Sequence, residues 1–371
     1  MFRKDIKNEV RAQLKKEYPN WKRIPKKMKK KIASDVLQEI VGGYDFKQDI
    51  TTPVENLLGI ENQAPVKGII GLDKMAQYIK NVHSDRILKL SSYNRSPIYI
   101  KDKELQFIDQ LIDDRVINTI LAYDGYSPAM RDILPCQCFR AELLKAIRYP
   151  EISYRKFCTN EYLGADRKQN RVFIGLPLHR STTIEHTRLS KFRSGLTFVQ
   201  QVNLLVYFLH HFYQSGLLGD RTICSVDSTE LSNDCRIPIA SITVHGKKVR
   251  IYSDLDCDCG ARRKKRDKSV YVVGYRLHTL TVIDAESKQS YPLVSLVAPA
   301  NHHDSSFLPF LVNLAQAMGL DIKLITADEA YHDKDGSMFK KTGVIVTTPP
   351  SSRCWLSIYN QKYPARIFRI N

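Results

Sequence analysis

The sequence predicts an α/β domain with a mixed sheet, preceded by a mostly α-helical region. Apolar residues recur at helical spacing up to about residue 216. From about residue 222, short apolar runs rich in Val, Ile, Thr or Tyr replace that pattern, and one amphipathic stretch interrupts them. At 371 residues, the chain is long enough for about two domains.

The N-terminal forty residues are strongly basic. They hold 13 Lys and Arg against 5 Asp and Glu, and the densest run extends from Lys22 to Lys31. Apolar positions recur at helical spacing up to Ile40, and Gly42 with Gly43 predicts the end of that helix. The basic run has two interpretations, a solvated helical face or a surface that contacts phosphates.

The middle of the chain keeps helical spacing, and we expect helices at 103–121, 139–148 and 197–213. Before the last of these, residues 181–184 (Ser-Thr-Thr-Ile) precede a basic helix. A Ser or Thr cap before a basic helix is typical of many DNA-reading helices. The candidate DNA contacts on this helix are Arg188, Lys191 and Arg193.

The last part of the chain predicts strands at 222–227, 270–283, 292–298, 323–327 and 344–348. Residues 305–318 form an amphipathic stretch between the third and fourth runs, and Gly319 predicts the end of that helix. Three strands, a helix, a strand, a helix and a final strand describe an α/β domain with a mixed sheet.

Two aspartates each follow an apolar run. Asp227 follows residues 223–226, and Asp328 follows residues 324–327. Carboxylates at the ends of neighbouring strands can converge on one point, where Mg²⁺ or Mn²⁺ would find the hard oxygen ligands it requires. An Asp at a strand end is also a common turn former or helix cap, so spacing alone leaves both interpretations open.

Four short motifs surround these aspartates in a fixed order. They are Asp227-Ser-Thr229, Gly274-Tyr-Arg-Leu-His278, Ala300-Asn-His-His-Asp304 and Ala327-Asp-Glu-Ala-Tyr331. In this order and strand context, they resemble the signature of bacterial insertion-sequence transposases of the DDE type. The resemblance covers about residues 222–348, and the Ser181–Ile184 segment resembles the usual start of that family's catalytic domain more weakly.

The resemblance implies a ribonuclease H-like sheet and a metal-dependent reaction on DNA. Asp227 and Asp328 would be the catalytic, metal-binding carboxylates, holding Mg²⁺ or Mn²⁺, with two ions in an intact enzyme. Tyr331 would shape the site or simply pack as an aromatic. The residues implied to bind phosphates of the transposon end are Arg276, His278 and the basic run Arg262, Arg263, Lys264, Lys265 and Arg266, for which a solvated hairpin loop is the alternative.

One departure from the family pattern affects the expected activity. The family's third ligand is a Glu on a later helix, preceded by a Tyr and an Arg at fixed spacing. Tyr363 and Arg366 have that spacing here, but Ile370 stands at the position of the Glu. Either Ile370 replaces the Glu, or the spacing is accidental and the Glu lay beyond a lost C-terminus. In both cases the site lacks one carboxylate, so we expect little or no strand transfer.

The charge composition of the chain indicates which kind of partner it binds. The net charge of +18 and the pI near 9.4 indicate an acidic polymer, which the resemblance implies to be double-stranded DNA, namely transposon terminal inverted repeats and target DNA. A homodimer assembled on DNA is also implied. No run approaches 18 apolar residues, and we expect a cytoplasmic, nucleoid-associated protein. The eight cysteines are expected to be free thiols, since CxC pairs are not the usual zinc spacing.

These observations predict three segments: a basic helical segment over 1–75, a helical DNA-binding region over 76–217 and a ribonuclease H-like catalytic domain over 218–371. The leading hypothesis is a transposase that cleaves and joins DNA at transposon ends. The alternative is a non-catalytic DNA-binding remnant that still recognises the terminal repeats. A ribonuclease H-like nuclease acting on RNA or hybrids is disfavoured by the large basic helical region.

Overall fold

The computed structural model describes residues 2–43, 67–84, 100–122, 133–178, 183–218, 223–233, 235, 237–244, 247–263, 269–283, 289–301, 304–331 and 336–349. The contacts divide the chain into two compact units. The first comprises residues 1–64, 220–316 and 321–371, and the second comprises residues 65–219 and 317–320. None of the helices in the described part of the chain is long and apolar enough to cross a membrane.

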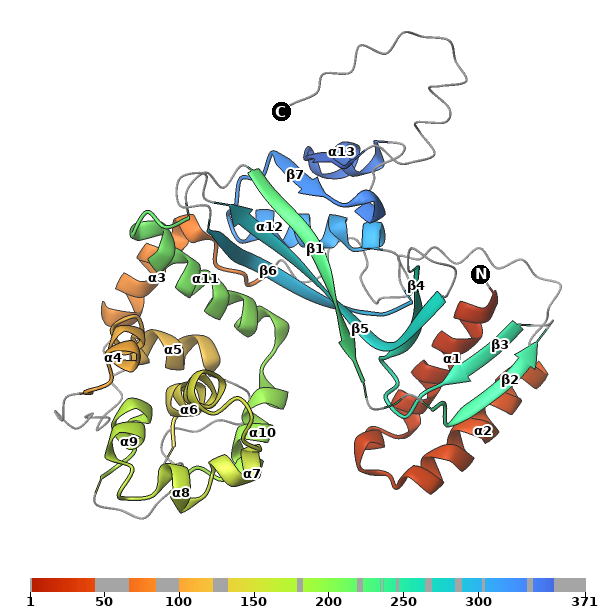
Figure 1. Cartoon of the computed structure of the whole chain (residues 1–371), viewed down its shortest axis with the longest axis horizontal. Helices are drawn as coiled ribbons and strands as arrows, with labels where there is room; N and C mark the ends of the chain where they lie inside the picture. The colour runs from red at the N-terminus through yellow and green to blue at the C-terminus, as the bar shows by residue number, and fades with distance from the viewer. Residues whose placement is uncertain are drawn as a thin grey trace, which may run out of the picture. The chain divides into compact units, whose positions relative to one another are not determined.

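The second unit is helical (Figure 1). Its buried Arg140 forms ion pairs with two aspartates, since Nη1 lies 2.5 Å from Asp109 and Nε lies 2.7 Å from Asp114. A buried guanidinium requires such partners to offset the cost of desolvation. The helices are α3 (Leu72–Ser84), α4 (Lys103–Gln110), α5 (Asp114–Leu121), α6 (Pro135–Arg148), α7 (Tyr154–Phe157), α8 (Asn160–Leu163), α9 (Lys168–Ile174), α10 (His186–Gly195) and α11 (Phe198–Gln214).

Capping residues explain where these helices differ from the expected ones. The helix predicted over 103–121 is divided into α4 and α5, because the Asp113 side chain accepts hydrogen bonds from the first-turn amides of α5. Helix α11 agrees with the prediction, and Thr197 and Gln200 form its capping box. Helix α10 begins after Glu185, which makes no side-chain capping bond. The predicted Ser or Thr cap of the basic helix is therefore wrong.

The first unit is built on a six-stranded mixed sheet. Its strands are β1 (Ile223–Ser232), β4 (Asp258–Arg263), β5 (Ser269–Ile283), β6 (Ser290–Pro299), β7 (Leu324–Ala327) and β8 (Ile345–Thr347). Their order is β4-β5-β1-β7-β8, with β6 also paired with β5. Strand β5 is antiparallel to β1, β4 and β6, whereas β1, β7 and β8 are mutually parallel neighbours. The five predicted strands and the α/β class are thus confirmed.

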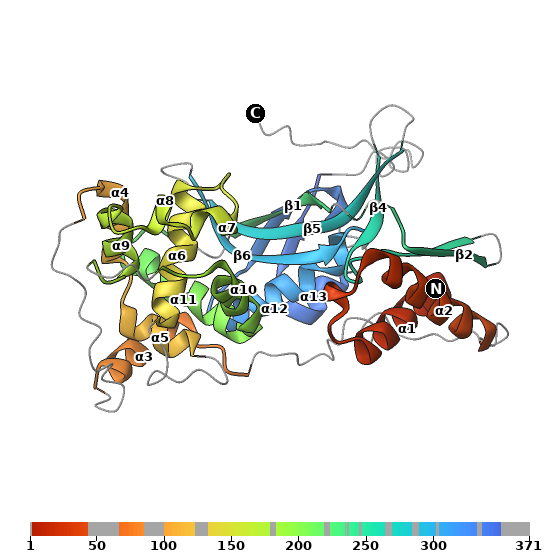
Figure 2. The same cartoon turned by 90° about the horizontal axis from the view of Figure 1, so that it is seen from below.

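Alternation along β1 gives the sheet a buried face and an exposed face. Cys224 and Val226 are buried, as are their partners Val282 and Leu280 on β5. Ile223, which points to the opposite face, is 48% exposed. Asp227 alternates with Val226 and is exposed, so it lies on the open face. Helix α12 (Leu308–Ala317) lies along the sheet (Figures 1 and 2).

The N-terminal helices share this unit with the sheet. Helices α1 (Phe2–Glu17) and α2 (Lys26–Gly43), joined through the 3₁₀ turn η1 (Trp21–Arg23), pack on the hairpin of β2 (Ala240–Val244) and β3 (Lys247–Ile251). The core residues are Ile6, Val10, Leu14, Trp21, Ala33, Val36, Leu37, Ile40, Ile239, Ala240, Val249, Ile251 and Leu255. The sequence predicted a separate helical segment over 1–75, whereas α1 and α2 share a core with β2 and β3. Helical periodicity predicts that a helix has an apolar face, but it does not predict which strands cover that face.

Three short elements follow the strands of the first unit: the 3₁₀ turns η4 (Asp304–Ser306) and η5 (Glu329–Tyr331) and helix α13 (Ser337–Thr342). Turn η4 follows β6, and turn η5 begins directly after Asp328. Both turns therefore belong to loops at the ends of strands, where binding and catalytic residues of α/β domains commonly lie.

Candidate active site

Asp227 and Asp328 lie at the same level of two neighbouring strands. Strands β1 and β7 pair in parallel, and the last pair of the register joins Val226 to Ala327. Asp227 is the next residue of β1, and Asp328 is the first residue after the end of β7. Because parallel strands in register present successive residues side by side, the two aspartates are adjacent at this position of the sheet. Strand β1 continues to Ser232, so the expected placement of Asp227 at the end of a strand is wrong, although the pairing of β1 with β7 still brings its position next to that of Asp328.

The pKa of Asp328 also indicates that the two carboxylates lie close together. The pKa of Asp328 is raised, first because burial penalises its charged form and then because Asp304 and Asp227 carry charge of the same sign. Hydrogen bonds from the backbone of Ala330 and Tyr331 act in the opposite direction. Like charges this close favour a cation between them, which is a property of metal sites and of acid–base sites alike.

Asp304 is a third acidic residue of this region, for which the sequence predicted no role. It lies in turn η4, is 6% exposed, and bonds Arg276 Nη1 at 2.5 Å. The Ser228 hydroxyl donates to its other oxygen at 3.4 Å. The only signal in the sequence was its place at the end of the Ala300–Asp304 motif. The Arg276 guanidinium compensates the charge of Asp304, unlike that of Asp227 or Asp328, for which no ion pair occurs among the described residues.

His278 lies in the interior beside this site. Its side chain is fully buried, stacks on Phe307 at a centroid distance of 5.2 Å, and shares a 2.8 Å hydrogen bond between Nδ1 and the Tyr331 hydroxyl. Burial lowers the pKa of His278. A fully buried imidazole cannot reach a phosphate at the surface, so the structure does not place His278 where the expected DNA contact would require it. Arg276 is largely occupied by Asp304 and only 18% exposed.

Tyr331 is buried as well, and burial raises its pKa above the usual range for a phenol. Its ring meets His278 edge-on, and its backbone amide donates to the carbonyl of Asp328 at 3.1 Å. Tyr331 therefore packs in the core, as one of the two interpretations expected, and its amide lies in the turn that follows Asp328.

The donor set fits a hydrated divalent cation. Mg²⁺ keeps several waters in most sites and needs one or two protein carboxylates together with substrate phosphates. Asp227 and Asp328 would supply these two carboxylates. Asp304, which is bonded to Arg276, lies beside them. Within the described ranges, no group of three or more His, Cys, Asp or Glu side chains is arranged to hold a metal ion. Ile370, which stands at the position of the family's third ligand, lies outside the described residues, as do Tyr363 and Arg366.

The other predicted DNA contacts belong to α10 and β4 or lie outside the described residues. On α10, Arg193 bonds Glu142 at 2.7 Å, and Arg188 donates to the carbonyl of Ile133, whereas Lys191 is exposed. Of the basic run, Arg262 and Arg263 end β4, where they pair with Val270 and Ser269 of β5. Lys264, Lys265 and Arg266 lie outside the described residues, as do His302 and His303.

Comparison with models of protein families, with curated proteins and with solved structures gives no significant match to this chain. The function is therefore inferred from the residues and their geometry.

Proposed function

We propose that the chain is a DDE-type transposase that acts on the DNA of transposon ends by metal-dependent phosphoryl transfer. The observation that carries the proposal is the parallel register of Val226 with Ala327, which sets Asp227 and Asp328 side by side. Two carboxylates, one on β1 and one directly after β7, form a suitable pair of ligands for the divalent cations of phosphoryl transfer. Each belongs to a motif that resembles that family.

The sheet supports the proposal independently of the motifs. Strands β6, β5 and β1 are antiparallel neighbours, and β7 and β8 continue from β1 in parallel. Three antiparallel strands followed by two parallel ones are expected of a ribonuclease H-like sheet. In that arrangement the acidic residues come from the central first strand and its parallel neighbour, which are β1 and β7 in this chain.

The residues of the site would have different roles in this reaction. Asp227 and Asp328 would hold Mg²⁺ or Mn²⁺, which when bound activates the attacking oxygen and stabilises the leaving one. Asp227 lies on the exposed face of the sheet, where a DNA backbone has room to approach. Asp304, with its charge compensated by Arg276, would fix the loop after β6 beside Ser228.

DNA is the proposed partner, and the charge of the first unit supports it. The exposed cations of α1, η1 and α2 are Lys15, Lys16, Lys22, Arg23, Lys26, Lys27, Lys30 and Lys31. Clustered Lys and Arg bind the phosphate backbone regardless of sequence and contribute an affinity that falls with salt. Recognition of terminal repeats by the helical unit, dimerisation on DNA and work in the bacterial cytoplasm are further parts of this proposal.

The test is binding and cleavage of DNA that carries the element's own terminal repeats, with Mg²⁺ or Mn²⁺ present. The unaltered chain is compared with Asp227→Ala and Ile370→Glu. We expect preferential binding of terminal-repeat DNA by all three and cleavage that appears or rises with Ile370→Glu and is absent with Asp227→Ala. Equal binding to random DNA of the same length would refute the transposase proposal.

A second candidate function is a DNA-binding protein without catalysis. It is favoured by Ile370, which stands at the position of the family's third ligand. Such a protein would occupy terminal repeats and block an intact enzyme. Selective binding combined with inactivity of every variant, Ile370→Glu included, would favour this function.

A further inference from the structure

The loops that follow β6 and β7 are both attached to strand β5. Arg276 and His278 are two residues apart on β5, so their side chains project to the same face of the sheet. Arg276 bonds Asp304 in the loop after β6, and His278 bonds Tyr331 in the turn after β7. One strand therefore connects to both loops that border the paired aspartates.

The turn after β7 is held by hydrogen bonds inside the turn and by one hydrogen bond to strand β5. Within it, the Asp328 side chain accepts a hydrogen bond from the amide of Ala330 at 3.0 Å, and the Asp328 carbonyl accepts one from Tyr331 at 3.1 Å. From without, the Tyr331 hydroxyl bonds His278 at 2.8 Å. Since β5 also pairs with β1, this bond relates the turn to the strand that carries Asp227.

The surroundings of His278 make that bond its main polar interaction. The imidazole is fully buried, with Phe307 stacked on it at an interplanar angle of 14° and Tyr331 edge-on at 90°. Its Nε2 atom has no hydrogen-bond partner within the described part of the chain. Burial of a polar ring costs free energy, and an apolar ring would fill the same space. What His278 adds to packing is a directional bond to Tyr331.

We propose that His278 is a positioning residue for Asp328, which it holds beside Asp227 through the Tyr331 hydroxyl. The inference deepens the proposed function and rests on it, since Asp328 is taken to be a cation ligand. Partners that orient a metal ligand tune the affinity of the site although they never touch the metal. His278 therefore contributes to cation binding from the interior, in place of the phosphate contact that the family resemblance implies.

The first test is hydrogen exchange of the full-length, metal-free chain at the amides of Ala330 and Tyr331. We compare Tyr331→Phe, which loses only the hydroxyl, with His278→Phe, which keeps an aromatic ring on Phe307. Exchange at both amides should become roughly two- to tenfold faster in His278→Phe, as expected for loss of one hydrogen bond, and at least as fast in Tyr331→Phe, which also removes the interaction of the hydroxyl with Ser228. Unchanged exchange in both variants would overturn the inference.

The matched control is Tyr275→Phe. Tyr275 lies three residues before His278 on the same strand, and its hydroxyl donates to Asp254 at 2.6 Å rather than to the turn after β7. This variant loses an equivalent hydroxyl bond, so it should leave exchange at Ala330 and Tyr331 unaltered. An equal acceleration in the control would also overturn the inference, because it would reflect general loosening of β5.

The second test separates this inference from the proposed function by direct Mn²⁺ titration. Asp227→Asn should abolish binding, while Tyr331→Phe and His278→Phe should weaken it by roughly tenfold. If Asp227→Asn binds Mn²⁺ as the unaltered chain does, the proposed metal site fails, and the inference that rests on it fails too. If Asp227→Asn loses Mn²⁺ but the other two variants keep full affinity, the positioning role alone is refuted.

Discussion

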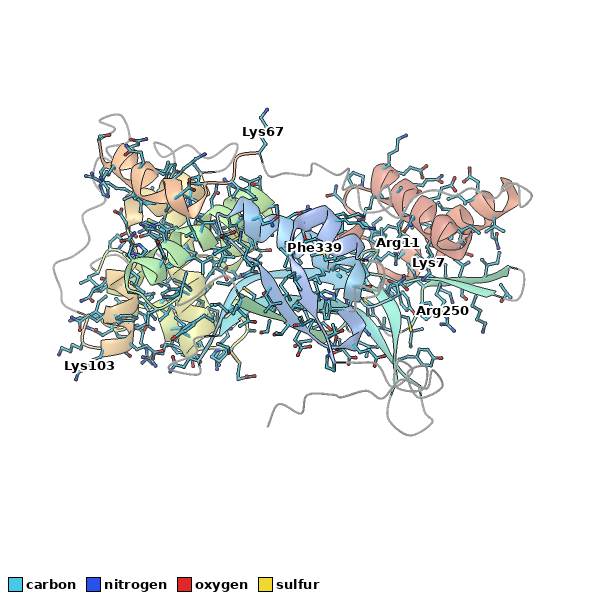
Figure 3. The ribbon with its side chains drawn as sticks, turned by 90° about the horizontal axis from the view of Figure 1, so that it is seen from above. Lys7, Arg11, Lys67, Lys103, Arg250 and Phe339 are labelled. Carbon is cyan, nitrogen blue, oxygen red and sulfur yellow. The ribbon has the colours of Figure 1, made fainter. Side chains whose placement is uncertain are left out.

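Lys7 of α1 donates to both carboxylate oxygens of Asp258, at 2.7 and 2.9 Å, although the two residues are 251 positions apart in the sequence. Both side chains are buried, and Arg11 and Asn301 donate to the same carboxylate. Lys7 and Arg11 are labelled on α1 in Figure 3. Asp258 thus joins the N-terminal helix, the start of β4 and the segment after β6. Asp304 lies three residues beyond Asn301, so this carboxylate connects α1 to the loop that borders the candidate site.

Breaking this ion pair from either side should strongly destabilise the first unit. Lys7→Met and Asp258→Asn each leave a buried charge without its main partner, and we expect each to cost about 3–5 kcal/mol. The double variant should cost less than the sum of the two. Urea unfolding of the full-length chain, analysed as a double-mutant cycle, measures the coupling.

The exposed ion pair of the same helix serves as the control. Lys15 pairs with Asp256, and both side chains are more than half exposed. Lys15→Met should change stability by less than about 1 kcal/mol. If Lys7→Met costs no more than Lys15→Met, burial does not strengthen the interaction and the connecting role of Asp258 is wrong.

Gly274→Ala should disrupt the junction of β1 and β5. Gly274 has φ of 153°, and a Cβ atom there would lie 2.1 Å from the carbonyl oxygen of Leu231. We expect a loss of at least about 2 kcal/mol in thermal or urea unfolding. Gly336→Ala is the matched comparison, since Gly336 also has positive φ, at 66°, but a Cβ atom would meet nothing within 4 Å. A smaller loss at Gly274 than at Gly336 would contradict this explanation.

The sequence predicted the sheet well because its strands carry their own pattern. The apolar runs of β1, β5, β6, β7 and β8 are bounded by turns and spaced as an α/β domain requires, and each was found. Strands β2, β3 and β4 were not predicted. Strands β3 and β4 mix Lys, Arg, Asp and Gly with few apolar positions, and β2 is a run of only five residues, Ala240–Val244. These short segments form strands where β2 pairs with β3 under α1 and α2 and where β4 pairs with β5.

The candidate site was predictable in part for a similar reason. Asp227 follows the apolar residues that begin β1, and Asp328 follows β7. The parallel pairing of these two strands brings the two positions next to each other. The orientation of Arg276 and His278 depends on which face of β5 is buried, and alternation alone does not say which face that is. Asp304 was missed because its importance comes from Arg276 and Ser228, two residues far from it in the sequence.

Asp328→Asn should raise stability at neutral pH in the absence of metal. The pKa of Asp328 is raised in the folded chain, by burial and by Asp304 and Asp227, so the folded state binds this proton more tightly than the unfolded state. The charged form therefore lowers stability as the pH rises through the folded pKa, and below the unfolded pKa of about 4 this penalty vanishes. The melting temperature of Asp328→Asn should exceed that of the unaltered chain at pH 7 and approach it at pH 3.

Two controls accompany the Asp328→Asn melts. Asp321→Asn removes an exposed aspartate of the same unit that pairs with Lys323 at 2.6 Å, and it should give no gain at pH 7. Added Mg²⁺ should stabilise the unaltered chain more than Asp328→Asn, because a cation between the carboxylates offsets their repulsion. A melting temperature of Asp328→Asn below that of the unaltered chain at pH 7 would show that the carboxylate is structural.

The salt dependence of DNA binding distinguishes a phosphate-binding N-terminal surface from a solvated helical face. Lys26, Lys27 and Lys30 are exposed on α2, whereas Arg193 of α10 bonds Glu142 and lies 3.9 Å over the Tyr154 ring. Replacing the three lysines with Gln should lower the slope of log affinity against log salt by about 3, close to one for each phosphate that is no longer neutralised. Arg193→Gln should leave the slope unchanged, because that guanidinium already has partners within the protein. An unchanged slope for the lysine variant would mean that these lysines only solvate the helix, and a reduced slope for Arg193→Gln would mean that α10 exchanges Glu142 for a phosphate on binding.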